Sequence, residues 1–466
     1  LFCRCPNRFG APPNSLVCPI CLGYPGTLPL LNREAVDRAV RLAAALGCEV
    51  RDVSVFARKN YFYADLPKGY QISQYDRPLA EGGTVPLSQH SRSVRLHRLH
   101  LEEDAGKLLH EAPGGAPLGD HSLVDFNRCG VPLVEIVSEP DLASPSEAED
   151  FLRTLHRVLR YTGTSDGNME EGSLRCDANV SLRRPGAATL GTKTEVKNLN
   201  SFRNVARALE AEIERQAERL DAGEAVIQET RGFDADRGTT WPLRGKEEAH
   251  DYRYFPEPDL RPLTLAPERV ARLRSDLPEL PWERRSRFVA SLGLPAEDAA
   301  DLTAARELAD YFERVVAVAA EVATPRTVGN WVRNEVLREL KVRRAEIGAA
   351  PDPALLAELL ALVERGELSA AAARTVLSET WSGAESPRAA MERLGLVQVR
   401  DESQLGDWVD QVLAAHAESV AEWRAGNVKV FGFLIGQVMK RSAGRADPKR
   451  VRELLTARLD ETAPTQ

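Results

Sequence analysis

A change of pattern near Leu277 constrains the fold of this chain more than any other feature. Before this point the sequence is rich in turn residues and in short alternating runs, which are typical of strands. After it, apolar residues recur at helical spacing, as in the segment from Asp301 to Val322. A single domain has roughly 100–200 residues, so a chain of 466 residues is expected to contain more than one.

These patterns predict an α+β protein of three parts. Residues 1–276 are expected to form a mostly antiparallel sheet with flanking helices. Residues 277–395 are expected to form an all-helical domain, and residues 396–466 a small tail of short amphipathic helices.

Composition places the chain among folded, soluble proteins. It has 43% hydrophobic and 28% charged residues, and no apolar run approaches a membrane span. Neither a basic-then-apolar leader nor a disulfide framework is visible, so we expect a cytoplasmic protein without membrane contact. The net charge of −8 argues against nonspecific coating of nucleic acid.

The tail is nevertheless basic. The segment from Arg424 to Arg458 contains nine Arg or Lys residues but only two acidic residues, Asp447 and Glu453. A solvated helix surface would explain this run, and so would contacts to RNA phosphates. The candidate RNA-binding residues flank a predicted helix–loop–helix and are Lys440, Arg441, Arg445, Lys449 and Arg450.

Four of the seven cysteines lie within the first 21 residues. Their order is Cys3-x-Cys5, twelve residues, then Cys18-x-x-Cys21, and prolines and glycines between them provide tight turns. Four thiolates delivered by two turns suit a tetrahedral zinc ion. Because such a site has no open coordination position, the predicted zinc is structural.

Acidic residues interrupt two predicted strands that otherwise read as apolar. Glu103 shares one side of an alternating run with Leu99 and Leu101, whereas Glu102 shares the polar side with His100. Glu135 is the single charge in Val131–Val137. A buried carboxylate must be paired, protonated or bound to a cation. Two such sites favour a hard cation such as Mg²⁺, although periodicity does not choose between Glu102 and Glu103.

A second polar surface is predicted further along the chain. Arg175 and Asp177 alternate with apolar residues through a ten-residue run, and Lys193 and Lys197 repeat the pattern on the next predicted strand. The polar side could simply face solvent. Together these residues would also form a floor that neutralises phosphate oxygens. No P-loop and no hydrolase nucleophile with its base is present.

Long strings of the chain resemble the B subunit of aspartyl/glutamyl-tRNA amidotransferases, the GatB family, and they occur in the same order from end to end. These strings are Arg58–Tyr63, Tyr70–Gln74, Leu99–Lys107, Asp125–Arg128, Glu170–Ser181, Glu195–Phe202 and Asp251–Asp259.

The resemblance implies a ligase that serves protein biosynthesis as a heterotrimer with a glutaminase A subunit and a small C subunit. Its N-terminal cradle domain would use ATP and Mg²⁺ to phosphorylate the carboxylate of Glu on tRNA(Gln) or Asp on tRNA(Asn). Ammonia from the A subunit would then displace phosphate, while the helical and tail domains hold the misacylated tRNA.

The resemblance also implies roles for single residues. It favours Glu102 over Glu103 beside Glu135 as a Mg²⁺ ligand, and it places Lys59 and Lys68 near the route of ammonia. In the family a histidine and an acid from an N-terminal strand complete the Mg²⁺ shell, and we expect that strand to precede Leu1. A noncatalytic, zinc-containing RNA-binding protein and a ligase acting on a free metabolite are the alternatives.

Overall fold

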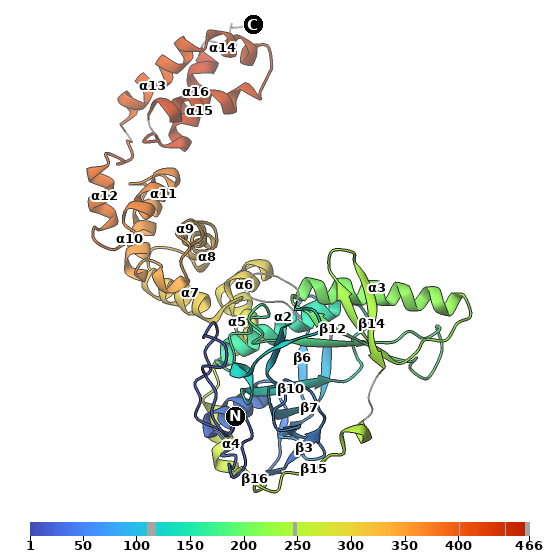
Figure 1. Ribbon diagram of the computed structural model, residues 1–466. Helices are drawn as coiled ribbons and strands as arrows, with labels where there is room; N and C mark the ends of the chain where they lie inside the picture. The colour runs from blue at the N-terminus through green and yellow to red at the C-terminus, as the bar shows by residue number, and fades with distance from the viewer. Residues whose placement is uncertain (110–117, 246–248, 400, 443, 462–466) are drawn as a thin grey trace. The chain divides into compact units, whose positions relative to one another are not determined.

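The computed structural model describes residues 1–109, 118–245, 249–399, 401–442 and 444–461 (Figure 1). The chain forms two compact units, Leu1–Trp282 and Glu283–Gln466. The first is rich in sheet and the second is helical, which confirms the predicted α+β class. The predicted boundaries at residues 277 and 396 remain predictions. No helix within the described residues is long and apolar enough to cross a bilayer.

The helices of the first unit are α1 (Arg33–Ala45), α2 (Pro145–Thr162), α3 (Phe202–Asp221) and α4 (Pro267–Ser275), with short turns η1 (Phe126–Arg128) and η2 (Ala249–Tyr252). The strands are β1 (Glu49–Val50), β2 (Val53–Ser54), β3 (Phe56–Asn60), β4 (Tyr70–Gln74), β5 (Ala80–Glu81), β6 (Thr84–Pro86), β7 (Ser93–Glu103), β8 (Lys107–Leu109), β9 (Leu123–Asp125), β10 (Pro132–Ser138), β11 (Cys176–Val180), β12 (Thr194–Leu199), β13 (Glu229–Asp234), β14 (Thr239–Gly245), β15 (Phe255–Pro256) and β16 (Leu263–Thr264).

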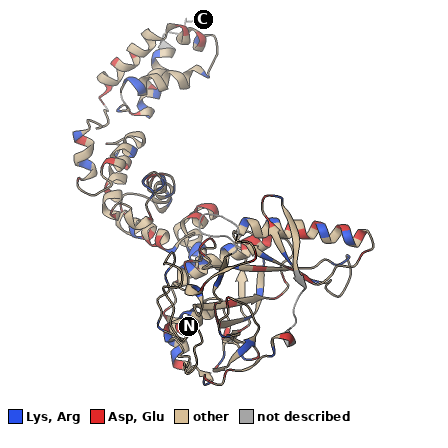
Figure 2. Ribbon diagram, viewed as in Figure 1, with Lys and Arg blue, Asp and Glu red and all other residues tan. Residues whose placement is uncertain are grey.

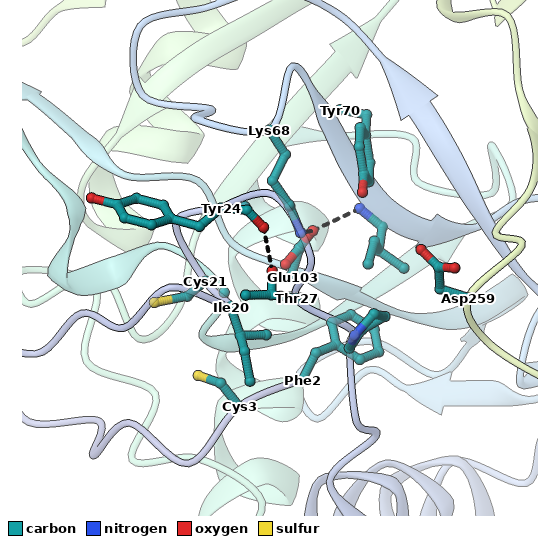
Figure 3. Close-up of a pocket in the computed structure, with 14 residues that line it drawn as sticks. Phe2, Cys3, Ile20, Cys21, Tyr24, Thr27, Lys68, Tyr70, Glu103 and Asp259 are labelled. Carbon is teal, nitrogen blue, oxygen red and sulfur yellow. Dashed lines mark hydrogen bonds and ion pairs between the residues drawn. The ribbon is translucent and has the colours of Figure 1, made fainter.

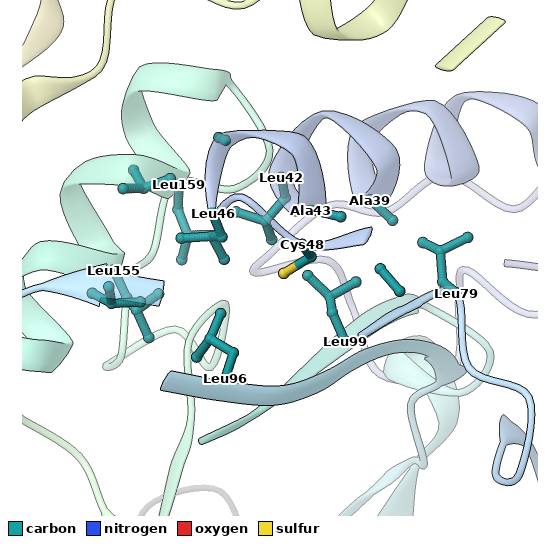
Figure 4. Close-up of a cluster of buried hydrophobic side chains, with 14 of the residues drawn as sticks. Ala39, Leu42, Ala43, Leu46, Cys48, Leu79, Leu96, Leu99, Leu155 and Leu159 are labelled. Atoms are coloured by element: carbon teal, nitrogen blue, oxygen red, sulfur yellow. The ribbon is translucent and has the colours of Figure 1, made fainter. Parts of the chain in front are cut away.

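Strand β7 organises the first sheet. This antiparallel sheet has the order β1-β5-β7-β10, with β6 also paired to β7. Helices α1 and α2 bury Leu42, Leu46 and Leu155 against Leu96 and Leu99 of β7 (Figure 4). Their apolar contacts fix β7 in place, because buried leucines each contribute roughly 1.5–3 kcal/mol to folding.

Local sequence signals explain where the long helices begin and end. Ser144 caps α2 by accepting a hydrogen bond from the amide of Glu147, and Pro145 occupies the first turn. Gly163 ends the helix with φ of 64°, a left-handed conformation that favours glycine. Ser201 caps α3 in the same way through the amide of Asn204.

The second sheet has the order β11-β12-β13-β14, and only the β12–β13 pair is parallel. The predicted strand over 174–183 is shorter in the structure and spans Cys176–Val180. A β-bulge in β12 places Lys197 and Asn198 opposite Asp177 alone, and Asn198 takes a left-handed φ of 66°. The bulge orients polar side chains at one edge of this sheet.

The second unit consists of helices around two separate groups of buried residues. One group extends from Phe288 to Met391 and the other from Leu405 to Leu459. The helices are α5 (Pro281–Leu292), α6 (Ala296–Leu302), α7 (Arg306–Val318), α8 (Pro325–Trp331), α9 (Leu337–Arg343), α10 (Pro353–Glu364), α11 (Ala370–Glu379), α12 (Pro387–Arg393), α13 (Glu402–Ala415), α14 (Ala417–Arg424), α15 (Val430–Arg441) and α16 (Pro448–Glu461), with η3 (Val332–Val336, a π-helical turn) and η4 (Ile347–Ala349).

Candidate functional site

The last five residues of β7, Leu99–Glu103, are all buried, although earlier residues of the strand alternate between buried and exposed. The side chains of β4 explain the change. The Gln74 amide oxygen accepts from the Leu101 backbone amide, and the Gln71 side chain donates to the Glu103 carbonyl. Polar side chains at this end of β7 are therefore buried and need partners.

Glu102, Glu135 and His100 come together on the two paired strands β7 and β10. His100 lies opposite Glu135 in the antiparallel register, and Glu102 lies two residues further along the same side of β7. His100 Nε2 is 3.6 Å from Glu102 Oε2 and 3.7 Å from Glu135 Oε2. Each residue offers a ligand atom within 4.8 Å of the others, so this cluster could hold a cation.

Electrostatics keep Glu102 ionised. Burial acts to raise the pKa of its carboxyl group, but the neighbouring His100, the ammonium of Lys59 and a hydrogen bond from Ser73 outweigh burial and lower that pKa. The Ser73 hydroxyl donates this hydrogen bond to Glu102 Oε2 at a distance of 2.9 Å. An ionised carboxylate is the form that binds a hard cation.

Glu135 departs from the environment that its sequence predicted. The apolar run around it indicated a strand buried on both faces, yet the Glu135 side chain is 49% exposed. One side of β10 is open there, because β10 is the edge strand of its sheet. The carboxylate thus joins the cluster from the solvent side, where a ligand can reach it.

Glu103 does not belong to the cluster of Glu102, Glu135 and His100. It forms a buried ion pair with Lys68, and its Oε1 accepts a hydrogen bond of 2.9 Å from the Ile72 amide. Glu103 and Lys68 line a cavity of about 140 Å³, together with Cys3, Cys21 and other residues (Figure 3). Because Lys68 already neutralises its charge, Glu103 does not need a metal ion as a counter-charge.

The four N-terminal cysteines lie together as their spacing predicts. Their sulfur atoms are within 4.8 Å of one another, and the Sγ atoms of Cys18 and Cys21 are 3.8 Å apart. A tetrahedral zinc ion about 2.3 Å from each sulfur separates neighbouring sulfurs by about 3.8 Å, so the geometry fits zinc. A hydrogen bond from Cys21 lowers the pKa of Cys3 to about 5, whereas burial and the neighbouring thiols raise that of Cys5 to about 12.

The predicted phosphate floor is only partly assembled. Lys197 Nζ lies 2.7 Å from Asp177 Oδ2 across the β12 bulge, and Lys193 is exposed just before β12. Arg175 instead forms an ion pair with Asp104, which follows β7 and also contacts Arg128. Arg175 and Lys197 are therefore already balanced by acids.

Lys59 lies next to the acid cluster, on β3. Its Nζ is 4.7 Å from the centre of the Tyr252 ring and 5.8 Å from that of Tyr61. These aromatic faces hold the ammonium by cation–π attraction. Lys59 and Lys68 thus occupy different surroundings, the first beside Glu102 and the second bonded to Glu103.

The five candidate RNA-binding residues of the tail lie on or between its last two helices, in a part of the chain where Figure 2 shows Lys and Arg in blue. Lys440 and Arg441 end α15, and Lys449 and Arg450 lie in the first turn of α16; all four are exposed. Arg445 is half-buried, with its guanidinium 5.7 Å from the centre of the Trp408 ring. Cations around a helix–loop–helix are accessible to phosphates.

Sequence reasoning missed the part played by His100 and Asp104. The alternating pattern placed His100 on the polar side of its strand without a role, yet the structure buries it between two acids. The spacing His100-x-Glu102 on one strand carried a signal for this cluster, because residues two apart point the same way. Nothing in the sequence pattern linked Asp104 to Arg175, which lies 71 residues away.

Comparison with known proteins identifies the class of the sheet-rich unit. Residues 1–271 match the GatB/GatE catalytic domain, and residues 310–459 match the GatB domain. Among curated relatives, the B subunit of the aspartyl/glutamyl-tRNA(Asn/Gln) amidotransferase of Geotalea daltonii is 52% identical, covering 98% of this chain and 95% of its own length.

Two further relatives carry the same name. The B subunit from Moorella thermoacetica is 51% identical (98% of this chain, 96% of its own), and that from Persephonella marina is 48% identical (97% and 94%). The chain therefore belongs to the GatB family of amidotransferase B subunits, which confirms the resemblance.

Proposed function

We propose that this chain activates the side-chain carboxylate of Glu on tRNA(Gln), Asp on tRNA(Asn), or both, with ATP, and then converts it to the amide. The observation that carries the proposal is the meeting of Glu102 and Glu135 on neighbouring strands, one buried and ionised and the other open to solvent. Membership of the GatB family supports the substrate class, because its relatives are named for these tRNAs.

The two steps require different help from the protein. In the first, a carboxylate oxygen attacks the γ-phosphorus of ATP and ADP leaves. In the second, the nitrogen of ammonia attacks the acyl carbon, the amide forms, and inorganic phosphate leaves with the electron pair of the broken C–O bond. A carboxylate resists ammonia until one oxygen becomes a leaving group, so the phosphorylation must come first.

The acid cluster supports the first step. The donor set of Glu102 and Glu135 suits Mg²⁺, which would neutralise charge on the phosphate oxygens when bound. Glu102 is fixed by Ser73 and by the packing of β4 along β7. Arg175, Lys193 and Lys197 would supply further positive charge, provided that a phosphate displaces Asp104 from Arg175 and Asp177 from Lys197.

The cavity side of β7 supports the second step. Lys68 and Glu103 line a partly open cavity that would shelter ammonia on its way to the acyl phosphate. Lys59 and Lys68 are proposed to lie along the route of ammonia. Cys3 and Cys21, two of the four cysteines that would hold structural zinc, line the same cavity.

The assembly that we propose is a cytoplasmic heterotrimer with a glutaminase A subunit and a small C subunit, because no nucleophile for glutamine hydrolysis is evident in the sequence. The cations Lys440, Arg441, Lys449 and Arg450 of the tail, with Arg445, would contact tRNA phosphates.

The replacement Glu135→Gln tests the proposal, with Glu139→Gln as a matched control just beyond the same strand. In the assembled complex, Glu135→Gln should lower ATP-dependent formation of amidated aminoacyl-tRNA at least about a hundredfold, while tRNA affinity is retained. Unchanged amidation by this variant would overturn the role of Glu135, whereas tRNA binding by the wild-type complex without any ATP-dependent amidation would favour a noncatalytic RNA-binding protein. Amidation of free glutamate without tRNA would show a small-metabolite ligase instead.

A further inference from the structure

Five of the nine tyrosines of the chain form one continuous row of ring contacts. Successive ring centres are 4.3–6.2 Å apart. The members come from three segments that are distant in the sequence, so the fold brings them together. In order, this tyrosine row consists of Tyr63, Tyr61, Tyr252, Tyr254 and Tyr75.

The tyrosine row passes beside the acid cluster and reaches the surface at both ends. Burial raises the pKa of Tyr254, and the nearby carboxylates of Glu102 and Glu135 raise it further, so this ring lies close to both acids. At the two ends of the row, Tyr63 is 44% exposed and Tyr75 is 38% exposed. A ligand can therefore reach the row from solvent and extend to the acids.

The end at Tyr75 suits a flat, charged ligand. Tyr75 and Tyr254 stack with ring planes 8° apart, whereas the other contacts of the row are edge-to-face. The Arg98 guanidinium donates to the Tyr75 carbonyl over 2.9 Å, and no ion pair joins it to a carboxylate of the described residues. Aromatic faces next to a cation are typical of sites for single-stranded nucleic acid.

A strained turn holds two rings of the row in place. Arg253 has a φ of 46°, which is uncommon for a residue other than glycine. The Asn60 side chain donates to the carbonyls of Tyr252 and Arg253 over 3.2 Å and 2.8 Å. These hydrogen bonds stabilise the turn, on which the rings of Tyr252 and Tyr254 are 6.2 Å apart. The row is therefore arranged before a ligand arrives.

We propose that the tyrosine row binds the single-stranded 3′ end of the aminoacyl-tRNA, with the base of the terminal adenosine stacked on Tyr75 and the adjoining phosphate at Arg98. The inference rests on the proposed function, and it adds the place of the terminal nucleotide. The carboxylate to be activated is linked through an ester to the terminal ribose, so this adenosine must lie close to the acid cluster. ATP also carries an adenine, but five rings offer more area than one base covers.

The fluorescence of 2-aminopurine, which falls when the base stacks, tests the proposal. In the assembled complex, misacylated tRNA ending in 2-aminopurine should be quenched on binding to the wild type. Tyr75→Leu should relieve most of this quenching and raise the KM for tRNA about tenfold, with the KM for ATP within about twofold of the wild type. Tyr75→Phe keeps the aromatic ring and should behave as the wild type.

Phe255→Leu is the matched control. Phe255 follows Tyr254 and is 45% exposed, yet no ring contact within the described residues joins it to the tyrosine row. This variant should change neither the quenching nor the KM for tRNA.

A tRNA ending in cytidine separates stacking from damage to the fold. The wild type should bind it more weakly than tRNA ending in adenosine, because the smaller base stacks less. Tyr75→Leu should bind the two alike, since the partner of the base is gone. Losses that simply add would show that Tyr75 only supports the fold, and they would overturn the proposal.

Further outcomes keep the test decisive. Absence of quenching in the wild type overturns the inference, and so does a raised KM for ATP with an unchanged KM for tRNA. If Tyr75→Leu does not fold, Arg98→Gln replaces it. That variant should weaken tRNA binding severalfold and reduce its dependence on salt, and unchanged binding overturns the inference. Quenching in a complex that forms no amidated tRNA would support the stacking site while refuting the proposed function.

Discussion

Two successive glutamates of β7 meet opposite environments. Glu102 points to the acid cluster, where Ser73, His100 and Glu135 surround it. Glu103 points to the cavity, where Lys68 neutralises it. Because neighbouring side chains of a strand point to opposite sides, one strand separates two sites of different chemistry. Glu103, which is paired with a lysine, therefore stabilises the fold. Glu102, which faces another acid, needs a cation from solution.

The largest expected effect separates the two glutamates by function. Glu102→Gln should weaken Mg²⁺ binding and ATP-dependent amidation at least about a hundredfold, because it removes a charged ligand. Glu103→Gln should leave the Mg²⁺ affinity, measured by isothermal titration, within about threefold of the wild type. Equal loss of Mg²⁺ in both variants would show that the two sides of β7 are not distinct.

The two variants should rank in the opposite order for folding stability, with Glu103→Gln the more destabilising. Glu103→Gln leaves the ammonium of Lys68 buried without its counter-charge, which costs about 3–5 kcal/mol. Denaturant unfolding should show this loss, and it should show a smaller loss for Glu102→Gln. Replacing both members of the pair, Lys68→Met with Glu103→Gln, should recover part of the stability. A double variant no better than Glu103→Gln would contradict the ion-pair explanation.

The cavity side should also depend on the cysteine cluster. Cys5→Ser should abolish a zinc content of about one ion per chain, measured by elemental analysis. It should also speed hydrogen exchange in residues 18–27, next to the cavity. Cys176→Ser is the control, because Cys176 lies on β11, outside the cluster. Unchanged zinc in Cys5→Ser would rule out the four-thiolate site.

The smallest effect concerns Lys59. Its ammonium lowers the pKa of Glu102, whose carboxylate is already ionised at neutral pH. Lys59→Met should therefore remove repulsion from the bound cation without protonating the ligand. Mg²⁺ should then bind a few-fold more tightly, by about 1 kcal/mol. Weaker Mg²⁺ binding in this variant would show that Lys59 helps to build the site.

Periodicity was enough to predict the class of the fold and the side of β7 on which each residue points. Leu99 and Leu101 lie in the core, with His100 and Glu102 on the opposite side, as the alternation indicates. The end of β11 was misjudged, because a polar–apolar alternation continues into residues that leave the ladder. Strand ends depend on pairing partners, which a local pattern does not reveal.

The candidate site could be predicted in its residue types but not in its grouping. Cys3, Cys5, Cys18 and Cys21 lie close in sequence, so their spacing was informative. The choice between Glu102 and Glu103 depended on Lys68 and Ser73, which come from another segment. The exposure of Glu135 depended on its strand being an edge, a property of the assembled sheet.

Asp104 links the two sheets of the first unit. It follows β7, yet its carboxylate holds Arg175, which precedes β11. An anion that captures the Arg175 guanidinium must compete with this carboxylate, while the apolar core that both sheets share stays in place. A phosphate arriving here would therefore exchange one anionic partner of Arg175 for another instead of meeting an unpaired cation.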